Sequence, residues 1–357
     1  MKRIIKFIAG NPWSLLLAAL PLTLAGQVLH WHPVAIFICA ALGIIPLAAY
    51  IGEATEDLAA YTNPRLGALL NATFGNAAEL IITITAVRAG FLELVKASIT
   101  GSIIGNLLLV LGFAMLTGGL RHGTQKFNKR NASRNAILLV LAVVALIIPS
   151  AWSQAIGTIG DPKVEALSIG VAIIMVVLYG LGLLEASNAK ESPLSHQLTK
   201  NDLPEWTASQ AILILLITTL GVVWLSETLV DATRAVIASL GVSEFFIGII
   251  LVPIIGNVAE HLVSVQLALK NKMDLSVEVA TSSSLQIALF VAPLLVFISI
   301  LLGHPLQLIF NRFELLAVLT AVVVSALVSS DGESTWLEGA GLLAVYLILG
   351  LGFFLLP

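Results

Sequence analysis

The stretch Gly75-Asn76-Ala77-Ala78-Glu79 returns 181 residues later as Gly256-Asn257-Val258-Ala259-Glu260. We call these two stretches the first and the second motif. Each lies inside a long apolar run, where a charged side chain costs roughly 2.5–3.5 kcal/mol even on lenient membrane-insertion scales. Two acidic residues at matching positions in such surroundings therefore need a functional reason.

The composition around the motifs is that of a membrane protein. Of the 357 residues, 58% are apolar and only 11% are charged, whereas a soluble domain carries about 25% charged residues. The formal net charge of −3 provides no basic excess for binding nucleic acid. Cys39 is the only cysteine, which excludes an internal disulfide and a cysteine-based zinc or iron–sulfur site.

Continuous apolar runs predict the fold class. A membrane-spanning helix needs roughly 20 apolar residues, and unbroken runs favour helices over the alternating strands of a β-barrel. We therefore expect an all-α, polytopic membrane protein with about eleven transmembrane helices. The basic N-terminus is also typical of a signal peptide, but no small-residue cleavage site follows it, so we expect a retained first helix. The predicted spans cover residues 13–29, 34–52, 66–87, 97–118, 134–151, 164–186, 207–226, 245–268, 275–302, 313–329 and 336–356.

The distribution of lysine and arginine predicts the orientation. If the N-terminus is cytoplasmic and the spans alternate, the inside segments hold 13 of the 18 lysine and arginine residues and the outside segments hold 5. Cytoplasmic loops are enriched in positive charge, so we predict an inside N-terminus and an outside C-terminus. No lysine or arginine lies in the middle of a predicted span, so neither glutamate has an obvious basic partner.

Three matched segments in the same order predict an internal repeat. Besides the motifs, residues 102–107 align with residues 282–287 at an offset of 180, and residues 53–57 resemble residues 227–231 at an offset of 174. The motifs lie on the third and eighth predicted spans, and a shift of five spans reverses the chain direction. Inverted repeats are typical of secondary transporters, whose sites lie at the repeat interface near the bilayer midplane.

The repeat also predicts how the chain is divided. The longest polar connection lies near the middle of the chain and separates the two copies. We expect an extra N-terminal transmembrane helix in residues 1–32, a first inverted repeat of helices 2–6 in residues 33–187, a cytosolic linker in residues 188–206, and a second inverted repeat of helices 7–11 in residues 207–357.

The residues of the motifs predict a cation site. Glycine weakens a helix, asparagine competes for its backbone hydrogen bonds, and Pro253 removes a donor in the second copy. We therefore expect a helix break beside each glutamate that frees carbonyl oxygens. Such hard oxygen ligands suit Ca²⁺, which takes about 6–8 of them, although polar side chains in spans also serve as interhelical hydrogen-bond partners. The candidate ligands are Glu79, Glu260, Asn76, Asn257, Gly75, Gly256, Ser102, Asn106, Ser283 and Gln286.

The charge of the glutamate pair predicts what is exchanged. Two ionised carboxylates close together in a low dielectric repel each other. One divalent cation or two protons relieve this repulsion, but hardly both at once. A site that crosses the membrane only when it is neutralised therefore exchanges Ca²⁺ for protons, with Glu79 and Glu260 as the proton-binding groups. This chemistry needs no cofactor, and the sequence carries no motif of a membrane-embedded enzyme.

Five further acidic residues fall towards the ends of predicted helices. One interpretation is that they are simply solvated at the membrane interface. The sharper hypothesis is a vestibule that attracts cations or relays protons. The residues are Glu53, Glu56, Asp57, Glu227 and Asp231.

These motifs resemble those of the cation/proton exchanger family, within the Ca²⁺/cation antiporter superfamily. The resemblance covers nearly the whole chain and rests on residues 52–56, 71–80, 101–112, 256–261 and 270–274. It implies an eleven-helix antiporter that expels cytosolic Ca²⁺ while protons enter. It also implies that Glu79 and Glu260 alternately bind protons and Ca²⁺.

Two regions depart from the family pattern. The linker is usually acidic in this family, but here it is nearly neutral, which argues against a regulatory Ca²⁺ site in it. Thr281-Ser282-Ser283-Ser284 replaces the expected small-residue element, which leaves the register of the matching serine open. The length of the chain suggests a prokaryotic inner-membrane protein that contacts the lipid bilayer, with the oligomeric state left open.

An exchanger coupled to Na⁺ or K⁺, or one with broad monovalent specificity, is the alternative. Extra acidic residues in place of ligand amides would favour Na⁺ coupling. The sequence keeps amides at residues 76, 106, 257 and 286, which favours protons.

Overall fold

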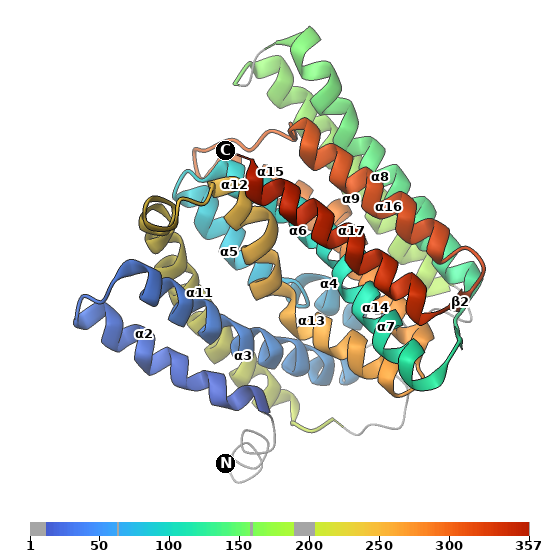
Figure 1. Ribbon diagram of the computed structural model, residues 1–357. Helices are drawn as coiled ribbons and strands as arrows, with labels where there is room; N and C mark the ends of the chain where they lie inside the picture. The colour runs from blue at the N-terminus through green and yellow to red at the C-terminus, as the bar shows by residue number, and fades with distance from the viewer. Residues whose placement is uncertain (1–11, 63, 158–159, 189–203, 357) are drawn as a thin grey trace.

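The computed structural model describes residues 12–62, 64–157, 160–188 and 204–356 (Figure 1). Most of the predicted linker, and the first eleven residues of the predicted extra helix, lie outside this part of the chain. The described residues form helices joined by short turns, together with one small antiparallel sheet. In that sheet β1 (Gln125–Lys126) pairs with β2 (Glu333–Ser334).

Helical segments occupy every predicted span, so the all-α fold is confirmed. Three short π-helical segments, η2, η3 and η4, interrupt the helices in the middle of the molecule. In chain order the helical elements are η1 (Pro12–Ala18), α2 (Ala19–Val28), α3 (Pro33–Ala60), α4 (Pro64–Phe74), α5 (Ala77–Arg88), α6 (Leu92–Ile104), η2 (Gly105–Val110), α7 (Leu111–His122), α8 (Lys129–Ile156), α9 (Pro162–Asn188), α11 (Ala208–Leu240), α12 (Glu244–Phe246), η3 (Ile247–Leu251), α13 (Val252–Leu269), α14 (Met273–Gln286), η4 (Ile287–Val291), α15 (Ala292–Leu301), α16 (Arg312–Val328) and α17 (Trp336–Leu355).

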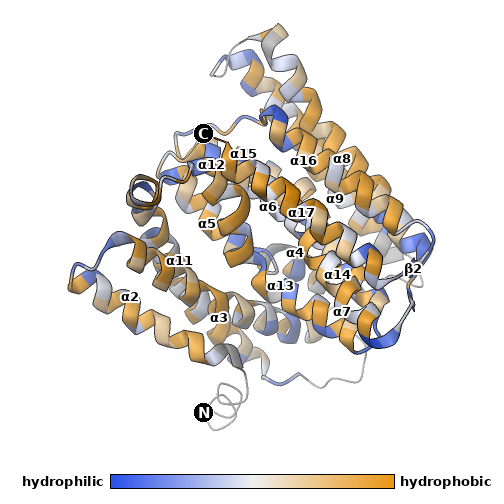
Figure 2. Ribbon diagram, in the orientation of Figure 1, coloured by the Kyte–Doolittle hydropathy of each residue, from blue (hydrophilic) through white to orange (hydrophobic). Residues whose placement is uncertain are grey.

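The stretch from α6 to α7 lies inside the molecule, whereas helices such as α9 and α17 belong to an apolar outer layer. The most apolar window of the stretch Leu92–His122 is 83% buried, whereas that of Pro162–Glu185 is 17% buried. Apolar side chains on the outer helices, such as Ile174 and Ile348, are 65% and 67% exposed. Figure 2 shows these helices as largely hydrophobic along their length. An outward apolar surface of this extent fits lipid rather than water.

Seven helices in the described part of the chain are long and apolar enough to cross a membrane. The number is eight if the bent pair Glu244–Val258 and Glu260–Leu269 counts as one span. The structure therefore fits a polytopic membrane protein, while the count of eleven spans stays a prediction.

One helix, α11, is longer than predicted, which corrects the placement of two acidic residues. The span predicted at 207–226 extends as α11 to Leu240, so Glu227 and Asp231 lie within this helix instead of beyond its end. The helix begins at a capping box on Thr207 and ends at Gly241, which adopts φ 66°. Acidic residues on the exposed side of a helix do not end it, because only a cap or a breaker does so.

The predicted helix breaks occur in two different forms. At the first motif, Gly75 and Asn76 form a turn between α4 and α5, which confirms a break there. At the second motif α13 stays helical through residues 256 and 257, and the helix is bent by 63° at a break between residues 258 and 260, beside Glu260. The second break is therefore a sharp bend and not an open turn.

Candidate functional site

The turn of the first motif positions Glu79. The Gly75 N–H donates to the Asn71 carbonyl at 2.8 Å, and the Leu80 N–H donates to the Asn76 carbonyl at 3.0 Å. The helix α4 therefore ends, and α5 begins, within two residues. A Cβ on Gly75 would collide with the Asn71 carbonyl oxygen, which explains the glycine. Glu79 therefore lies in the first turn of α5, where the helix dipole favours a negative charge.

The second motif contacts the first through its glycine. A Cβ on Gly256 would lie 2.9 Å from Oε1 and 3.0 Å from Cδ of Glu79, so the carboxylate rests against the backbone of α13. Glu260 is an electrostatic neighbour of Glu79. The structure thus brings the two glutamates together from α5 and α13. None of the four ion pairs among the described residues involves either of them.

Two asparagine–serine hydrogen bonds cross between the motifs. Asn257 Nδ2 donates to Ser102 Oγ at 3.0 Å, and Ser283 Oγ donates to Asn76 Oδ1 at 3.3 Å. Both asparagines and both serines are separated by 181 residues, like the glutamates. The serine register is therefore 181, and the alignment of residues 102–107 with 282–287 at an offset of 180 was wrong. Ser282 instead donates to the Val279 carbonyl at 3.4 Å.

The remaining candidates orient this group. Asn106 Nδ2 donates to Ser283 Oγ at 2.9 Å, and Asn76 Nδ2 donates to Gln286 Oε1 at 2.7 Å. Glu260 is a further hydrogen-bonding neighbour of Ser283, whose one hydroxyl proton is directed to Asn76 in the bond given above. The structure therefore brings the side chains of all eight predicted polar candidates into one cluster.

Several oxygens of this cluster are buried and have no hydrogen-bond partner. A buried carboxylate or amide oxygen without a partner costs free energy, so their gathering at one place calls for a bound positive charge. All are hard acceptors of the kind that Ca²⁺ prefers. The described residues contain no group of three or more His, Cys, Asp or Glu placed to hold a metal, so amides would complete any ligand set. The orphaned atoms are Glu79 Oε1 and Oε2, Glu260 Oε2, Asn106 Oδ1 and Asn257 Oδ1.

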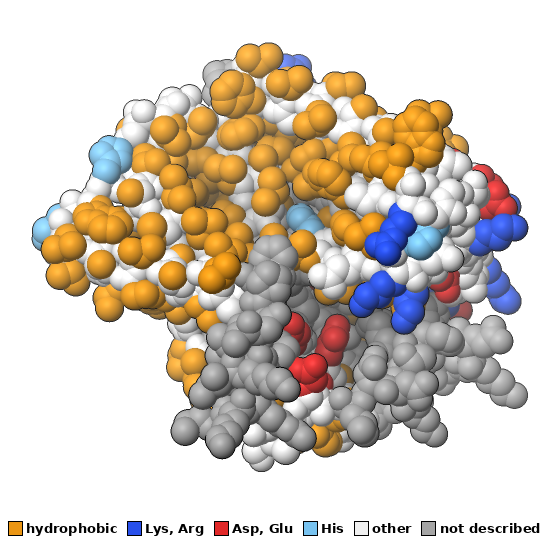
Figure 3. Space-filling view, turned by 60° about the horizontal axis from the view of Figure 1, so that its bottom comes forward, with side chains coloured by type: hydrophobic (Ala, Val, Ile, Leu, Met, Phe, Trp, Pro, Cys, Tyr) orange, Lys and Arg blue, Asp and Glu red, His pale blue; other side chains and the backbone are white. Residues whose placement is uncertain are grey.

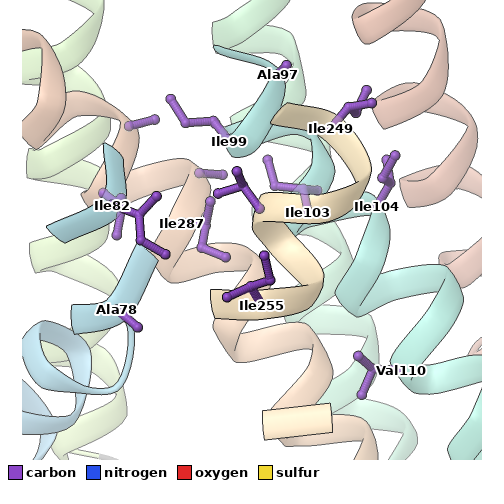
Figure 4. Close-up of a cluster of buried hydrophobic side chains, with 14 of the residues drawn as sticks. Ala78, Ile82, Ala97, Ile99, Ile103, Ile104, Val110, Ile249, Ile255 and Ile287 are labelled. Atoms are coloured by element: carbon purple, nitrogen blue, oxygen red, sulfur yellow. The ribbon is translucent and has the colours of Figure 1, made fainter. Parts of the chain in front are cut away.

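Apolar side chains from the same helices pack next to the site. Ile82, Ile103 and Ile249 come from α5, α6 and η3 and are fully buried. Figure 4 shows them converging with Ile99 and Ile287 from adjoining turns. The polar cluster of the site and this apolar cluster therefore lie within a few helical turns of each other. The apolar side chains offer no ligand atoms to an ion.

The opposite side of the site is accessible. Gly75 is exposed, yet its neighbour Asn76 is 1% exposed and Glu79 is 3% exposed. The turn of the first motif thus marks the boundary between solvent and the buried cluster. Figure 3 shows a group of acidic side chains on the lower face of the molecule.

The five predicted vestibule residues separate into two groups. Glu53 interacts electrostatically with Glu56, Asp57 and Glu205 at the end of α3, and Glu53 Oε2 is buried without a hydrogen-bond partner. Asp57 Oδ2 accepts the N–H of residue 206 at 2.8 Å. Glu227 is instead exposed and pairs with Arg88 at 3.4 Å.

Sequence reasoning missed a buried ion pair. Lys96 is 8% exposed and lies within α6, because this helix begins at Leu92 and not at residue 97. Its Nζ lies 2.6 Å from Glu93 and donates to the Ile309 carbonyl at 3.0 Å. The spacing of three between Glu93 and Lys96 was the available signal. Lys96 leaves the site glutamates without a basic partner.

Comparisons with known proteins agree over almost the whole chain. The family described as "Sodium/calcium exchanger protein" matches residues 32–186 and 210–355. The "Ca(2+)/H(+) antiporter" of Aphanothece halophytica is 47% identical, covering 96% of both chains. The "Ca(2+)/H(+) antiporter ChaA" of Bacillus subtilis is 43% identical, covering 96% of this chain and 98% of that one. The solved structure of native YfkE superposes with a TM-score of 0.85 at 42% identity, covering 96% of this chain and all of that one.

Proposed function

Because the chain belongs to the sodium/calcium exchanger family, we propose that it is a secondary active Ca²⁺/H⁺ antiporter that exports cytosolic Ca²⁺ in exchange for protons by alternating access. It is a membrane transporter and not an enzyme, and relatives named Ca²⁺/H⁺ antiporters align with it over nearly their full length. The observation that carries the proposal is the cluster of orphaned oxygens between the two motifs.

In this proposal Glu79 and Glu260 bind Ca²⁺ and protons in alternation. The orphaned oxygens of both glutamates, Asn106 and Asn257 act as ligands, with backbone oxygens near Gly75 and Gly256 as further donors. Ser102, Ser283, Asn76 and Gln286 hold the ligands in position through hydrogen bonds. Bringing two ionised carboxylates together in a low dielectric is unfavourable, so a departing Ca²⁺ must be replaced by protons.

Alternating access follows from an inverted pair of repeats. The common offset of 181 residues for asparagine, serine and glutamate supports two repeats in residues 33–187 and 207–357, with an extra helix in residues 1–32. Ile82 of α5 and Ile99 of α6, which belong to the apolar cluster of Figure 4, lie between the site residues of these helices and their connection at residues 89–91. The charge distribution assigns that connection, with Arg88 and Lys96 beside it, to the outside. We infer that this conformation is open towards the cytoplasm beside Gly75 and closed towards the outside.

The same orientation assigns roles to the acidic residues. Glu53, Glu56 and Asp57 would form a vestibule that attracts Ca²⁺ at the cytoplasmic mouth, because clefts lined by one sign of charge concentrate counter-ions. Glu227 and Asp231 would lie at the outer end of α11, with the N-terminus inside and the C-terminus outside. The bacterial relatives support a cytoplasmic membrane as the location.

Transport in everted membrane vesicles tests the proposal. With an acid interior and no Na⁺ or K⁺ gradient, the protein is expected to drive ⁴⁵Ca²⁺ uptake, and a protonophore is expected to collapse it. Vesicles without the protein provide the control. Uptake that needs a Na⁺ or K⁺ gradient instead would establish the alternative, an exchanger of monovalent cation specificity, and would contradict proton coupling.

A further inference from the structure

A cavity separate from the exposed turn of the first motif reaches the site from its other side. It encloses about 80 Å³, and a water molecule needs roughly 10–15 Å³ of such volume, so several waters fit. Helices α8, α9 and α14 line it, and α8 packs against both α9 and α14. The proposed Ca²⁺ entrance beside Gly75 does not use this cavity.

One face of α14 provides a polar stripe along the cavity. Glu278, Ser282 and Gln286 follow one another at intervals of four residues, so they share a helix face, and all three line the cavity. None of the three is fully buried. Ser283 points about 100° away around the same helix, into the cation site. The helix therefore presents one polar row to the cavity and another to the site.

The inner end of the stripe is connected to the glutamates by hydrogen bonds. Gln286 Oε1 accepts from Asn76 Nδ2 at 2.7 Å, and Asn76 Oδ1 accepts from Ser283 Oγ at 3.3 Å. Ser283 in turn hydrogen-bonds Glu260. A continuous polar chain thus leads from the Glu260 carboxyl group to the water-sized space.

The outer end of the stripe is charged. Arg134 of α8 pairs with Glu185 of α9 at 3.3 Å, with side chains 30% and 64% exposed. The groups that act on Glu278 are Arg134 and Asp274, which lies one turn earlier on α14, and the cavity wall adds Glu185 and the Tyr179 hydroxyl. This charged end of the cavity lies beside the basic segment 121–134. The charge distribution places that segment in the cytoplasm.

We propose that this cavity is a proton pathway separate from the Ca²⁺ entrance, and that Glu278 is its relay group. The proposal rests on the proposed antiport function. A proton released by the site passes to a water molecule at the Gln286 end of the cavity, which becomes hydronium. The hydronium protonates the Glu278 carboxylate, which then releases the proton to cytoplasmic water.

Comparing two transport modes of the reconstituted protein tests this pathway. Ca²⁺/Ca²⁺ exchange at equal pH moves no protons, whereas pH-driven ⁴⁵Ca²⁺ uptake requires them. Glu278→Gln is expected to slow pH-driven uptake by about tenfold or more, with Ca²⁺/Ca²⁺ exchange unchanged. A positioned proton-transfer group contributes roughly 10²–10⁴-fold to a rate, and water in the cavity still carries part of the proton flux. Glu278→Asp is expected to restore most of the rate. Glu165→Gln, on the far end of α9, serves as the matched control and is expected to behave as wild type.

Filling the cavity provides an independent test. Gly182 lines it, and a Cβ there would meet only Leu138 Cδ1 at 4.0 Å, so Gly182→Leu places a side chain in the space without a clash. It is expected to reproduce the selective loss of pH-driven uptake. Gly180→Leu is the control, because Gly180 has nothing within 4 Å of its Cβ position and does not line the cavity.

The outcomes separate this pathway from the antiport itself. If both variants keep wild-type pH-driven uptake, or if both modes fall together in folded protein, the pathway is overturned. Wild-type protein that shows no pH-driven uptake would instead overturn the proposed function.

Discussion

The two motifs share a sequence pattern but contribute differently to the site. In the first motif the chain breaks at an exposed Gly75, and the following Glu79 is 3% exposed with both oxygens orphaned. In the second motif the helix only bends, its glycine is buried beneath Glu79, and Glu260 has Ser283 as a hydrogen-bonding neighbour. Two motifs of matching sequence therefore do not make equal ligands. The first motif provides the carboxylate that lacks hydrogen-bond partners on both oxygens, and the second motif provides the backbone surface against which this carboxylate rests.

The largest expected effect comes from removing one carboxylate. Glu79→Gln and Glu260→Gln each leave a single negative charge facing Ca²⁺, so we expect pH-driven uptake to fall by roughly a hundredfold or more, beyond the 10–100-fold typical of groups that only orient a metal ligand. Glu79→Gln is expected to impair Ca²⁺/Ca²⁺ exchange more strongly, because it neutralises the carboxylate whose two oxygens both lack a hydrogen-bond partner, whereas Glu260 has one such oxygen. Uptake of ⁴⁵Ca²⁺ in both modes measures this, with yield and monodispersity in detergent as the control for insertion. Normal uptake by both variants would contradict the site.

Much of this arrangement is predictable from sequence, because a buried pair of negative charges can be neutralised in only a few ways. The paired glutamates, their asparagines and the spans follow from charge inside apolar runs and from periodicity. The serine register does not, since Thr281–Ser284 offers polar groups at four consecutive positions and only the contact with Asn76 selects Ser283. The true length of α11 was also hidden, because Glu227 on an exposed helix face resembles a helix end in a hydropathy pattern. Glu278 was overlooked because its role depends on a cavity between distant helices.

The asparagines sharpen the comparison between the motifs. Asn257 Oδ1 has no hydrogen-bond partner, whereas Asn76 uses its oxygen for Ser283 and its amide group for Gln286. We therefore expect Asn257→Ala to raise the Ca²⁺ KM by about tenfold, equivalent to ~1.4 kcal/mol. Asn76→Ala removes an orienting group and is expected to have a smaller effect. Ca²⁺/Ca²⁺ exchange over a range of Ca²⁺ concentrations measures both values. A larger effect at Asn76 would reverse the assignment of ligand and orienting group.

The smallest expected effect separates adjacent serines. Ser283 hydrogen-bonds Asn76, Asn106 and Glu260, so Ser283→Ala removes a group shared by both motifs. We expect the Ca²⁺ KM to rise by a few-fold, since each neutral hydrogen bond contributes about 0.5–1.5 kcal/mol. Ser282→Ala makes the same chemical change one position earlier, on the cavity side of α14, and is expected to leave the Ca²⁺ KM unaltered. An effect on KM at Ser282 with none at Ser283 would restore the offset of 180 and with it a different pairing of the two halves. Because the two variants differ by only one position on one helix, a difference in KM between them reports the register and not a general loss of packing.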